Sequence, residues 1–162
     1  MIRLTVACVI GIAGIVTACA PAPVPIAYGE DTCARCMMGI SDARFGAELV
    51  TSTGKVHTFD SIECLAAFFD ETADPGSVHS LWVTDFGSPG ELLPAGSAAY
   101  LVESRLNSPM GLSLVAFAED VDKDSITAAF GGRVVDWEEV RVRIRSSGDP
   151  HGGHQPAEAS SE

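Results

Sequence analysis

The sequence predicts an α+β fold built from two ββαβ units that follow each other within a single small domain. Two observations predict this fold. Segments typical of strands and helices occur twice in the same order: strand, strand, helix, strand. In addition, the stretch from Phe59 to Phe69 has a faint counterpart between Asp124 and Phe130, which indicates an internal duplication.

The first unit spans residues 43–86. A Ser-Thr-Gly turn at 52–54 separates its first two strands and makes them a short hairpin. Asp60 or Ser61 is placed to cap the helix that follows. The predicted elements are strands at Ala43–Thr51 and Lys55–Phe59, a helix ending near Asp70, and a strand at Val78–Phe86.

The second unit spans residues 97–145. Two glycines at 131–132 end its helix. In the last segment, Trp137–Arg145, apolar residues alternate with arginines, and this alternation favours a strand over a helix. The other predicted elements are strands at Ser97–Ser104, Leu112–Ala118 and Arg133–Asp136, and a helix at Lys123–Phe130.

Residues 1–18 have the pattern of a secretory signal peptide, with Arg3 before an apolar segment that small residues follow. The four residues ending at Cys19 resemble a lipobox, so we expect lipidation of Cys19 and anchoring to a bacterial membrane. Simple secretion with Cys19 as a free thiol is the alternative. Residues 19–28 then form the lipidated, proline-rich tether. Ala20 rather than Asp follows the cysteine, and by resemblance to Gram-negative sorting rules this favours the outer membrane over the inner one.

The folded domain is expected at residues 29–145, followed by a disordered, acidic tail at 146–162. His151 and His154 in this tail could bind a metal transiently, although such a pair is more often only polar tail. The chain has 22 acidic and 10 basic residues. This balance argues against a nucleic-acid partner, because a phosphate backbone attracts basic surfaces.

A sulfur-rich segment follows the tether. Two thiols and two thioethers fall within six positions, at Cys33, Cys36, Met37 and Met38. Such soft donors select Cu(I) over hard cations. A thioredoxin-like motif would place Cys-x-x-Cys at the start of a helix after a strand, and a structural zinc site would need two further ligands. The sequence therefore favours a Cu(I) site.

Other candidate ligands are less distinctive. In an extended segment the side chains of Cys36 and Met38 would point to the same side. Met110, in a Pro-Met-Gly turn, is either a ligand or a loop residue that packs on the core. On pattern alone, His57 is a structural or surface histidine, Cys64 a buried inert thiol, and Asp60 a helix cap.

Several motifs in order along the chain resemble the NosL family, the lipoproteins that assist copper assembly in nitrous oxide reductase. They are the lipobox at Cys19, the segment Cys33–Asp42, the stretch Phe59–Cys64, Ala99-Tyr100, and Ser108-Pro109-Met110-Gly111. Met37 departs from the family pattern, which usually has Gly there. The resemblance implies a duplicated ββαβ fold and copper ligation by Cys36, Met38 and Met110, with Cys33, Cys64 and His57 as secondary candidates.

The sequence and the resemblance together predict a membrane-tethered Cu(I) metallochaperone, not an enzyme. The resemblance implies delivery of copper in the periplasm to nitrous oxide reductase or to its copper-site assembly machinery. One alternative is an extracytoplasmic thiol-disulfide reductase that uses Cys33 and Cys36 to keep the copper-site cysteines of a partner reduced. Another is a lipoprotein scaffold in which the sulfur cluster is incidental.

Overall fold

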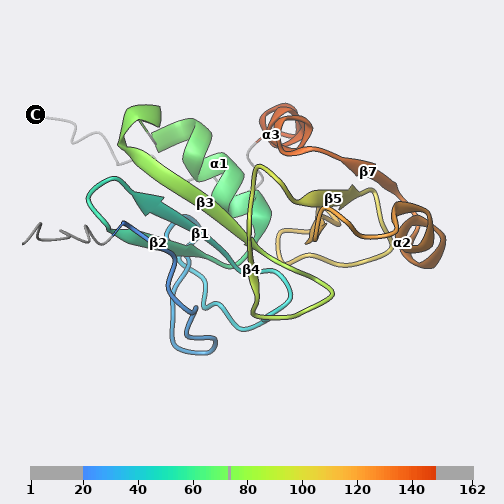
Figure 1. The fold of residues 1–162 in the computed structure, drawn as a ribbon, viewed down its shortest axis with the longest axis horizontal. Coiled ribbons are helices and arrows are strands. Elements are labelled where there is room, and N and C mark those ends of the chain that lie inside the picture. The colour runs from blue at the N-terminus through green and yellow to red at the C-terminus, as the bar shows by residue number, and fades with distance from the viewer. Residues whose placement is uncertain (1–19, 73, 149–162) are drawn as a thin grey trace, which may run out of the picture.

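Two antiparallel sheets stand side by side, each with a helix packed against it (Figure 1). They belong to a computed structural model that describes residues 20–72 and 74–148. The predicted signal peptide, Cys19, His151 and His154 lie outside the described residues. Within the described part of the chain, no helix is long and apolar enough to cross a membrane.

The first sheet has the strand order β2-β1-β3-β4. Helix α1 (Ile62–Thr72) packs on one face of it, and a short 3-10 turn, η1 (Pro75–Ser77), leads into β3 (Figure 1). The strands are β1 (Ala47–Thr51), β2 (Val56–Phe59), β3 (Val78–Thr84) and β4 (Leu92–Pro94).

The second sheet has the order β6-β5-β7. Its strands are β5 (Ala99–Val102), β6 (Val115–Phe117) and β7 (Arg133–Val135), and its helices are α2 (Lys123–Phe130) and α3 (Trp137–Ser146). In both sheets the first strand of the unit lies between the second and the third, and all these pairings are antiparallel. The predicted duplicated ββαβ fold is therefore confirmed.

The prediction of a strand at Trp137–Arg145 is wrong, because this segment is helix α3. Asp136 caps the helix by accepting a hydrogen bond of 2.9 Å from the backbone N–H of Glu139. Acidic residues in the first turn and arginines in the last complement the helix dipole. Trp137, Val140 and Ile144 have helical spacing and pack against the core, whereas Val142 is exposed. Strand β4, of only three residues, is an element that the sequence did not predict.

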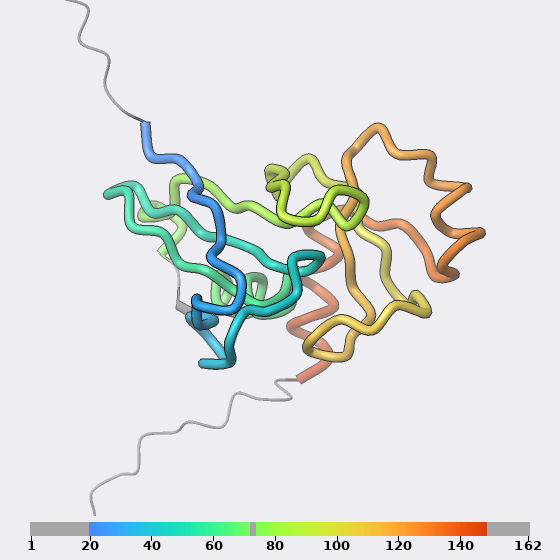
Figure 2. Tube along the Cα trace, turned by 90° about the horizontal axis from the view of Figure 1, so that it is seen from below, coloured from blue at the N-terminus to red at the C-terminus, as the bar shows by residue number. Residues whose placement is uncertain are grey.

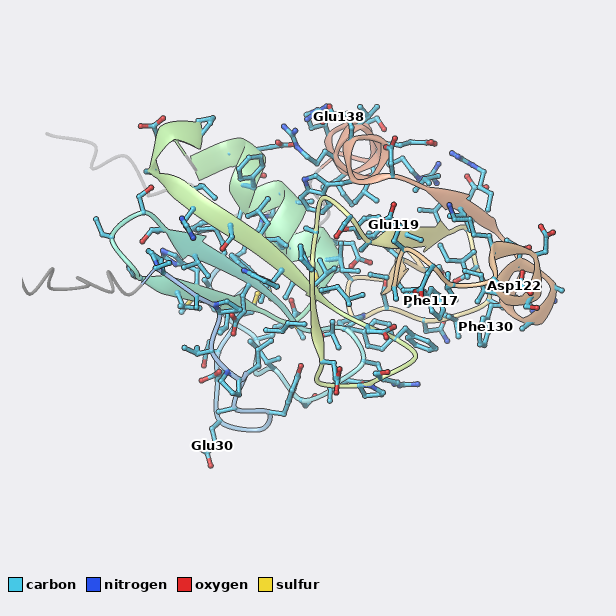
Figure 3. The ribbon with its side chains drawn as sticks, in the orientation of Figure 1. Glu30, Phe117, Glu119, Asp122, Phe130 and Glu138 are labelled. Carbon is cyan, nitrogen blue, oxygen red and sulfur yellow. The ribbon has the colours of Figure 1, made fainter. Side chains whose placement is uncertain are left out.

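The two halves are joined by a parallel backbone bridge between Asp85, just after β3, and Ala116. The backbone N–H of Phe86, after β3, donates a 2.8 Å hydrogen bond to the carbonyl of Ala116 in β6. A large core extends from α1 across both sheets to Tyr100 and Val140. A second, smaller core lies under α2, where the rings of Phe117 and Phe130 stack with centroids 6.3 Å apart (Figure 3).

The segment from Val24 to Tyr28, which the sequence assigned to the tether, packs against the sheet. Ile26 is buried, and the backbone N–H of Val24 donates a 3.1 Å hydrogen bond to Glu48 Oε2 in β1. Gly46 permits this approach, because a Cβ there would lie 2.7 Å from side-chain atoms of Ile26 and Tyr28. The two ends of the described chain, near Ala20 and Gly148, lie on opposite sides of the molecule (Figure 2).

Candidate metal site

A tight hairpin carries the first two cysteines of the site. Thr32 and Gly39 pair as an antiparallel bridge, and the N–H of Cys33 donates a 2.8 Å hydrogen bond to the carbonyl of Met38. The hairpin is held on the outer edge of β2 by a 2.8 Å hydrogen bond from the N–H of Ala34 to the carbonyl of Thr58. This contact brings the cysteines beside the start of α1.

Four side chains converge where the hairpin meets α1. The sulfur atoms of Cys33, Cys36 and Cys64 and a carboxylate oxygen of Asp60 all lie within 4.8 Å of one another. Cys33, Cys64 and Asp60 are buried and Cys36 is partly exposed, so the cluster opens to solvent on the Cys36 side. We call these four residues the cysteine cluster.

Local capping explains why Asp60 belongs to the cluster. Ser61, not Asp60, caps α1: its hydroxyl accepts a 3.2 Å hydrogen bond from the N–H of Cys64. The prediction that Asp60 is a simple cap is therefore wrong. The sequence carried a signal for this role of Asp60. Asp60 and Ser61 are both residue types that cap helices, but a helix has one N-cap position, so one of the two side chains is available for other contacts.

The thiols have different affinities for protons. The hydrogen bond from Cys64 lowers the pKa of Cys33 to about 6, and backbone N–H groups of Asp60, Cys36 and Arg35 contribute to this shift although burial opposes it. The same hydrogen bond to Cys33, followed by burial, raises the pKa of Cys64. Burial is the main reason that the pKa of Cys36 rises to about 11. One thiolate is thus favoured inside the cluster before any metal binds.

The donor set fits a soft or borderline metal ion. Three thiols and one carboxylate offer four donors within reach of one ion, and soft donors dominate. Oδ1 of Asp60 is buried and has no hydrogen-bond partner, an arrangement that is costly unless something binds there. The cluster is therefore suited to hold a thiophilic cation.

The two neighbouring methionines face solvent. The side chains of Met37 and Met38 are 73% and 56% exposed. The backbone is not extended at this point, because Cys36 lies in a turn and Met37 adopts a left-handed conformation with φ of 62°. The expected extended segment, on which the pairing of Cys36 with Met38 was based, is wrong. Ligation by Met38 stays a prediction.

Met110 lies near Cys64. Both residues line a pocket of about 300 Å³ between α1 and α3, which we call the α1–α3 pocket. The loop carrying Met110 is fixed to α1 because the hydroxyl of Ser108 donates a hydrogen bond to Glu63 Oε1. Burial raises the pKa of Glu63 despite this bond, and its Oε2 makes no hydrogen bond of normal geometry.

His57 lies on β2 and stands apart from the cysteine cluster. Its ring packs against that of Phe68 with centroids 5.2 Å apart, and burial together with Lys55 lowers its pKa. This packing agrees with the structural interpretation of His57. Its ligand role stays a prediction.

The fold and the cysteine cluster define a small duplicated α+β protein with a thiol-rich candidate metal site. Comparison with known proteins identifies its family. The sequence model of the NosL family matches residues 23–144, and the chain belongs to this family.

Two relatives illustrate the match. Copper-binding lipoprotein NosL from Stutzerimonas stutzeri is 29% identical over 139 residues, covering 80% of this chain and 73% of the relative. The crystal structure of the copper chaperone NosL from Shewanella denitrificans superposes with a TM-score of 0.58 at 24% identity, over 72% of this chain and 96% of that chain. The second comparison supports the fold.

Proposed function

We propose that this protein is a membrane-anchored Cu(I) metallochaperone that delivers copper in the periplasm for assembly of the nitrous oxide reductase copper centre. The observation that carries the proposal is the cysteine cluster, three thiols and a carboxylate within 4.8 Å of one another, beside a pocket that contains Met110. Relatives named as a copper-binding lipoprotein and a copper chaperone support copper as the cargo. Both names describe binding proteins rather than enzymes.

Burial in the cluster suggests how copper enters and leaves. Cys36 is the most accessible of the three thiols, so it is the proposed first contact for incoming copper and the last for departing copper. Cys33 and Cys64 are buried and complete the coordination. Each thiol that binds copper releases its proton, and the hydrogen-bonded Cys33 requires the least work to do so. Met38 and Met110 are the proposed thioether donors.

The remaining parts of the proposal concern location. Cys19 is the proposed site of lipid attachment, with the outer membrane favoured and the domain facing the periplasm. The name of the Stutzerimonas stutzeri relative, a lipoprotein, supports an anchor. The proposed recipients are nitrous oxide reductase or its copper-site assembly machinery, and no nucleic acid is involved.

The thiol-disulfide reductase alternative has less support. Such an enzyme attacks with an accessible thiolate of low pKa. Here the accessible thiol, Cys36, has a raised pKa of about 11. The thiol with the lowered pKa, Cys33, has 0% exposure. Reduction of a partner disulfide by the purified protein, surviving loss of Met38 and Met110, would favour this alternative.

Anaerobic titration with Cu(I) against a chromophoric chelator tests the site. Cys36→Ser, Cys33→Ser, Cys64→Ser and Met110→Leu are each expected to weaken binding at least severalfold, with Met37→Leu as the matched control. Unchanged affinity in both the Cys36 and the Met110 variants would reject the ligand assignment. Delivery is tested by adding the copper-loaded protein to copper-free reductase, which should gain its copper centre faster than with copper from the chelator.

A further inference from the structure

The chain enters the domain through a segment that lies on the first sheet without joining it. We call this segment, residues 20–26, the strap. Every second residue from 21 to 25 is a proline, which has no backbone N–H, and the strap takes part in no β-ladder. Within the described chain, a single hydrogen bond connects the strap to the sheet, from the N–H of Val24 to Glu48 Oε2 at 3.1 Å. Ile26 is the only buried side chain of the strap.

The acceptor of this hydrogen bond is a buried carboxyl group. Glu48 lies in β1 and has 0% exposure. Thr58 of β2 and Trp82 of β3 stand directly opposite it in the register, so their side chains share its face of the sheet. Neither of these side chains carries a charge. Oε1 of Glu48 has no hydrogen-bond partner among the described residues. The strap thus covers a carboxyl group to which it offers one donor.

An ionised Glu48 finds no cation at this place. Burial raises the pKa of Glu48 to about 7, and the charge of Asp31 adds to the shift, although the hydrogen bond from Val24 opposes it. Tyr28 also interacts with Glu48, and it stays neutral because burial raises its own pKa. No basic side chain in the described part of the chain stabilises the carboxylate. Ionisation of Glu48 is therefore unfavourable while the strap is in place.

We infer that the strap is a detachable connection, which lies on the sheet while Glu48 is protonated and leaves it when Glu48 ionises. Release brings the carboxylate into water and costs one hydrogen bond and the burial of Ile26. Residues 20–26 span roughly 20 Å when they are extended. With the proposed anchor at Cys19, release would let the domain stand further from the membrane. This consequence for reach rests on the proposed function, whereas the release itself does not.

The size of the effect follows from the linkage between docking and protonation. Glu48 titrates at about 7 under the strap and at its ordinary value of 4.5 once water reaches it. The docked state holds a proton that the released state has lost, so docking is favoured at low pH and weakens as the pH rises to about 7. The docking equilibrium should fall roughly 30-fold between pH 5.5 and pH 8.5.

NMR of the full chain in detergent micelles at these two pH values tests the release. The δ1-methyl group of Ile26 lies 2.7 Å from where a Cβ on Gly46 would be, so an NOE between these residues reports docking. We expect this NOE to weaken strongly at pH 8.5, and the backbone order of Val24 to fall with it. Glu48→Gln keeps the acceptor but cannot ionise, so its strap should stay docked at both pH values. Glu30→Gln, at an exposed carboxyl just after the strap, is the matched control and should behave like the unaltered chain (Figure 3).

The methyl resonances of Leu49, in the core beside Glu48, separate release of the strap from loss of the whole fold. They should keep their folded positions at pH 8.5. Unfolded Leu49 resonances at that pH would overturn the inference, as would an Ile26 NOE of equal strength at both pH values. The same loss of the NOE in Glu48→Gln would exclude Glu48 as its cause. None of these results depends on Cu(I), so a chain that fails to bind Cu(I) would reject the proposed function and leave the strap as inferred.

Discussion

The hydroxyl of Ser108 donates a hydrogen bond to the buried carboxyl of Glu63, which joins the loop carrying Met110 to the first turn of α1. The same hydroxyl accepts a 3.1 Å hydrogen bond from the N–H of Ser113. One side chain thus fixes both ends of this loop. The position of Met110 relative to Cys64 depends on it.

Ser108→Ala is therefore expected to lower the free energy of unfolding by about 1–3 kcal/mol, because a buried carboxyl loses its hydrogen-bond donor. Cu(I) affinity should also fall, since Met110 is less well positioned. Urea unfolding and chelator competition measure the two effects. The exposed Ser88, replaced by Ala, is the control. Equal stability of the two variants would contradict the role assigned to Ser108.

Met37→Gly is expected to stabilise the protein by roughly 0.5–1 kcal/mol. A residue with a side chain is strained in the left-handed conformation, and relief of this strain exceeds the entropic cost of glycine. Little packing is lost, because Met37 is largely exposed. The control is Met38→Gly, where φ is not left-handed and stability should fall. Urea unfolding that ranks the two variants in the opposite order would contradict this account.

Glu48 should make stability depend on pH. Burial raises its pKa from 4.5 to about 7 in the folded protein. The folded state thus holds a proton that the unfolded state has lost, and the free energy of unfolding should fall as pH rises from 4.5 to about 7. Thermal unfolding across this range should show a smaller decline in Glu48→Gln. Part of the decline should remain, because burial also raises the pKa of Glu63. An identical pH profile in the variant would exclude Glu48 as a cause.

The contact between α1 and α3 depends on Arg141. Its guanidinium lies 2.6 Å from Asp70 and 4.9 Å from the ring centroid of Phe69. Arg141→Ala should cost roughly 1–2 kcal/mol, because the ion pair is largely buried and stacks on an aromatic ring. Arg143→Ala removes a more exposed ion pair with Glu103 and should cost less than about 0.5 kcal/mol. Urea unfolding that gives equal losses would contradict this difference.

The proposed anchor is tested by Cys19→Ala. The variant is expected in the soluble periplasmic fraction, and mass spectrometry of the unaltered protein should find acyl chains on residue 19. Cys36→Ala, which keeps the lipobox, should stay in the membrane. Ala20→Asp should move the protein from the outer to the inner membrane fraction. Membrane association that survives loss of Cys19 would exclude this anchor.

Most of the fold was predictable, because alternation and turn residues are local signals. Segments such as Val56–Phe59 and Lys123–Phe130 carry their own pattern. Helix α3 was missed because Val140 and Ile144 fit both a helical and an alternating pattern, and the exposed Val142 completes the alternation. The capping pair Asp136 and Glu139 was the better indicator. Strand β4 exists only through pairing with β3, which no local pattern reveals.

The candidate site was predictable in part of its residues, the thiols of Cys33 and Cys36, but only partly in its geometry. Sulfur density pointed to a soft metal, yet the inclusion of Cys64 and Asp60 depends on where the hairpin docks. That docking combines a backbone hydrogen bond from Ala34 to Thr58 with an ion pair of 2.9 Å between Arg35 of the hairpin and Glu71 of α1. These partners lie far apart along the chain, so no local pattern in the sequence predicts the pairing.

The opposite placement of Ala20 and Gly148 has a consequence for how the protein stands on a membrane (Figure 2). Cys19 directly precedes Ala20, so the lipid anchor proposed above would hold the molecule by that side. The α1–α3 pocket includes Gly148 at the other end of the described chain. Under that proposal, the anchor and the pocket would lie at different sides of the domain.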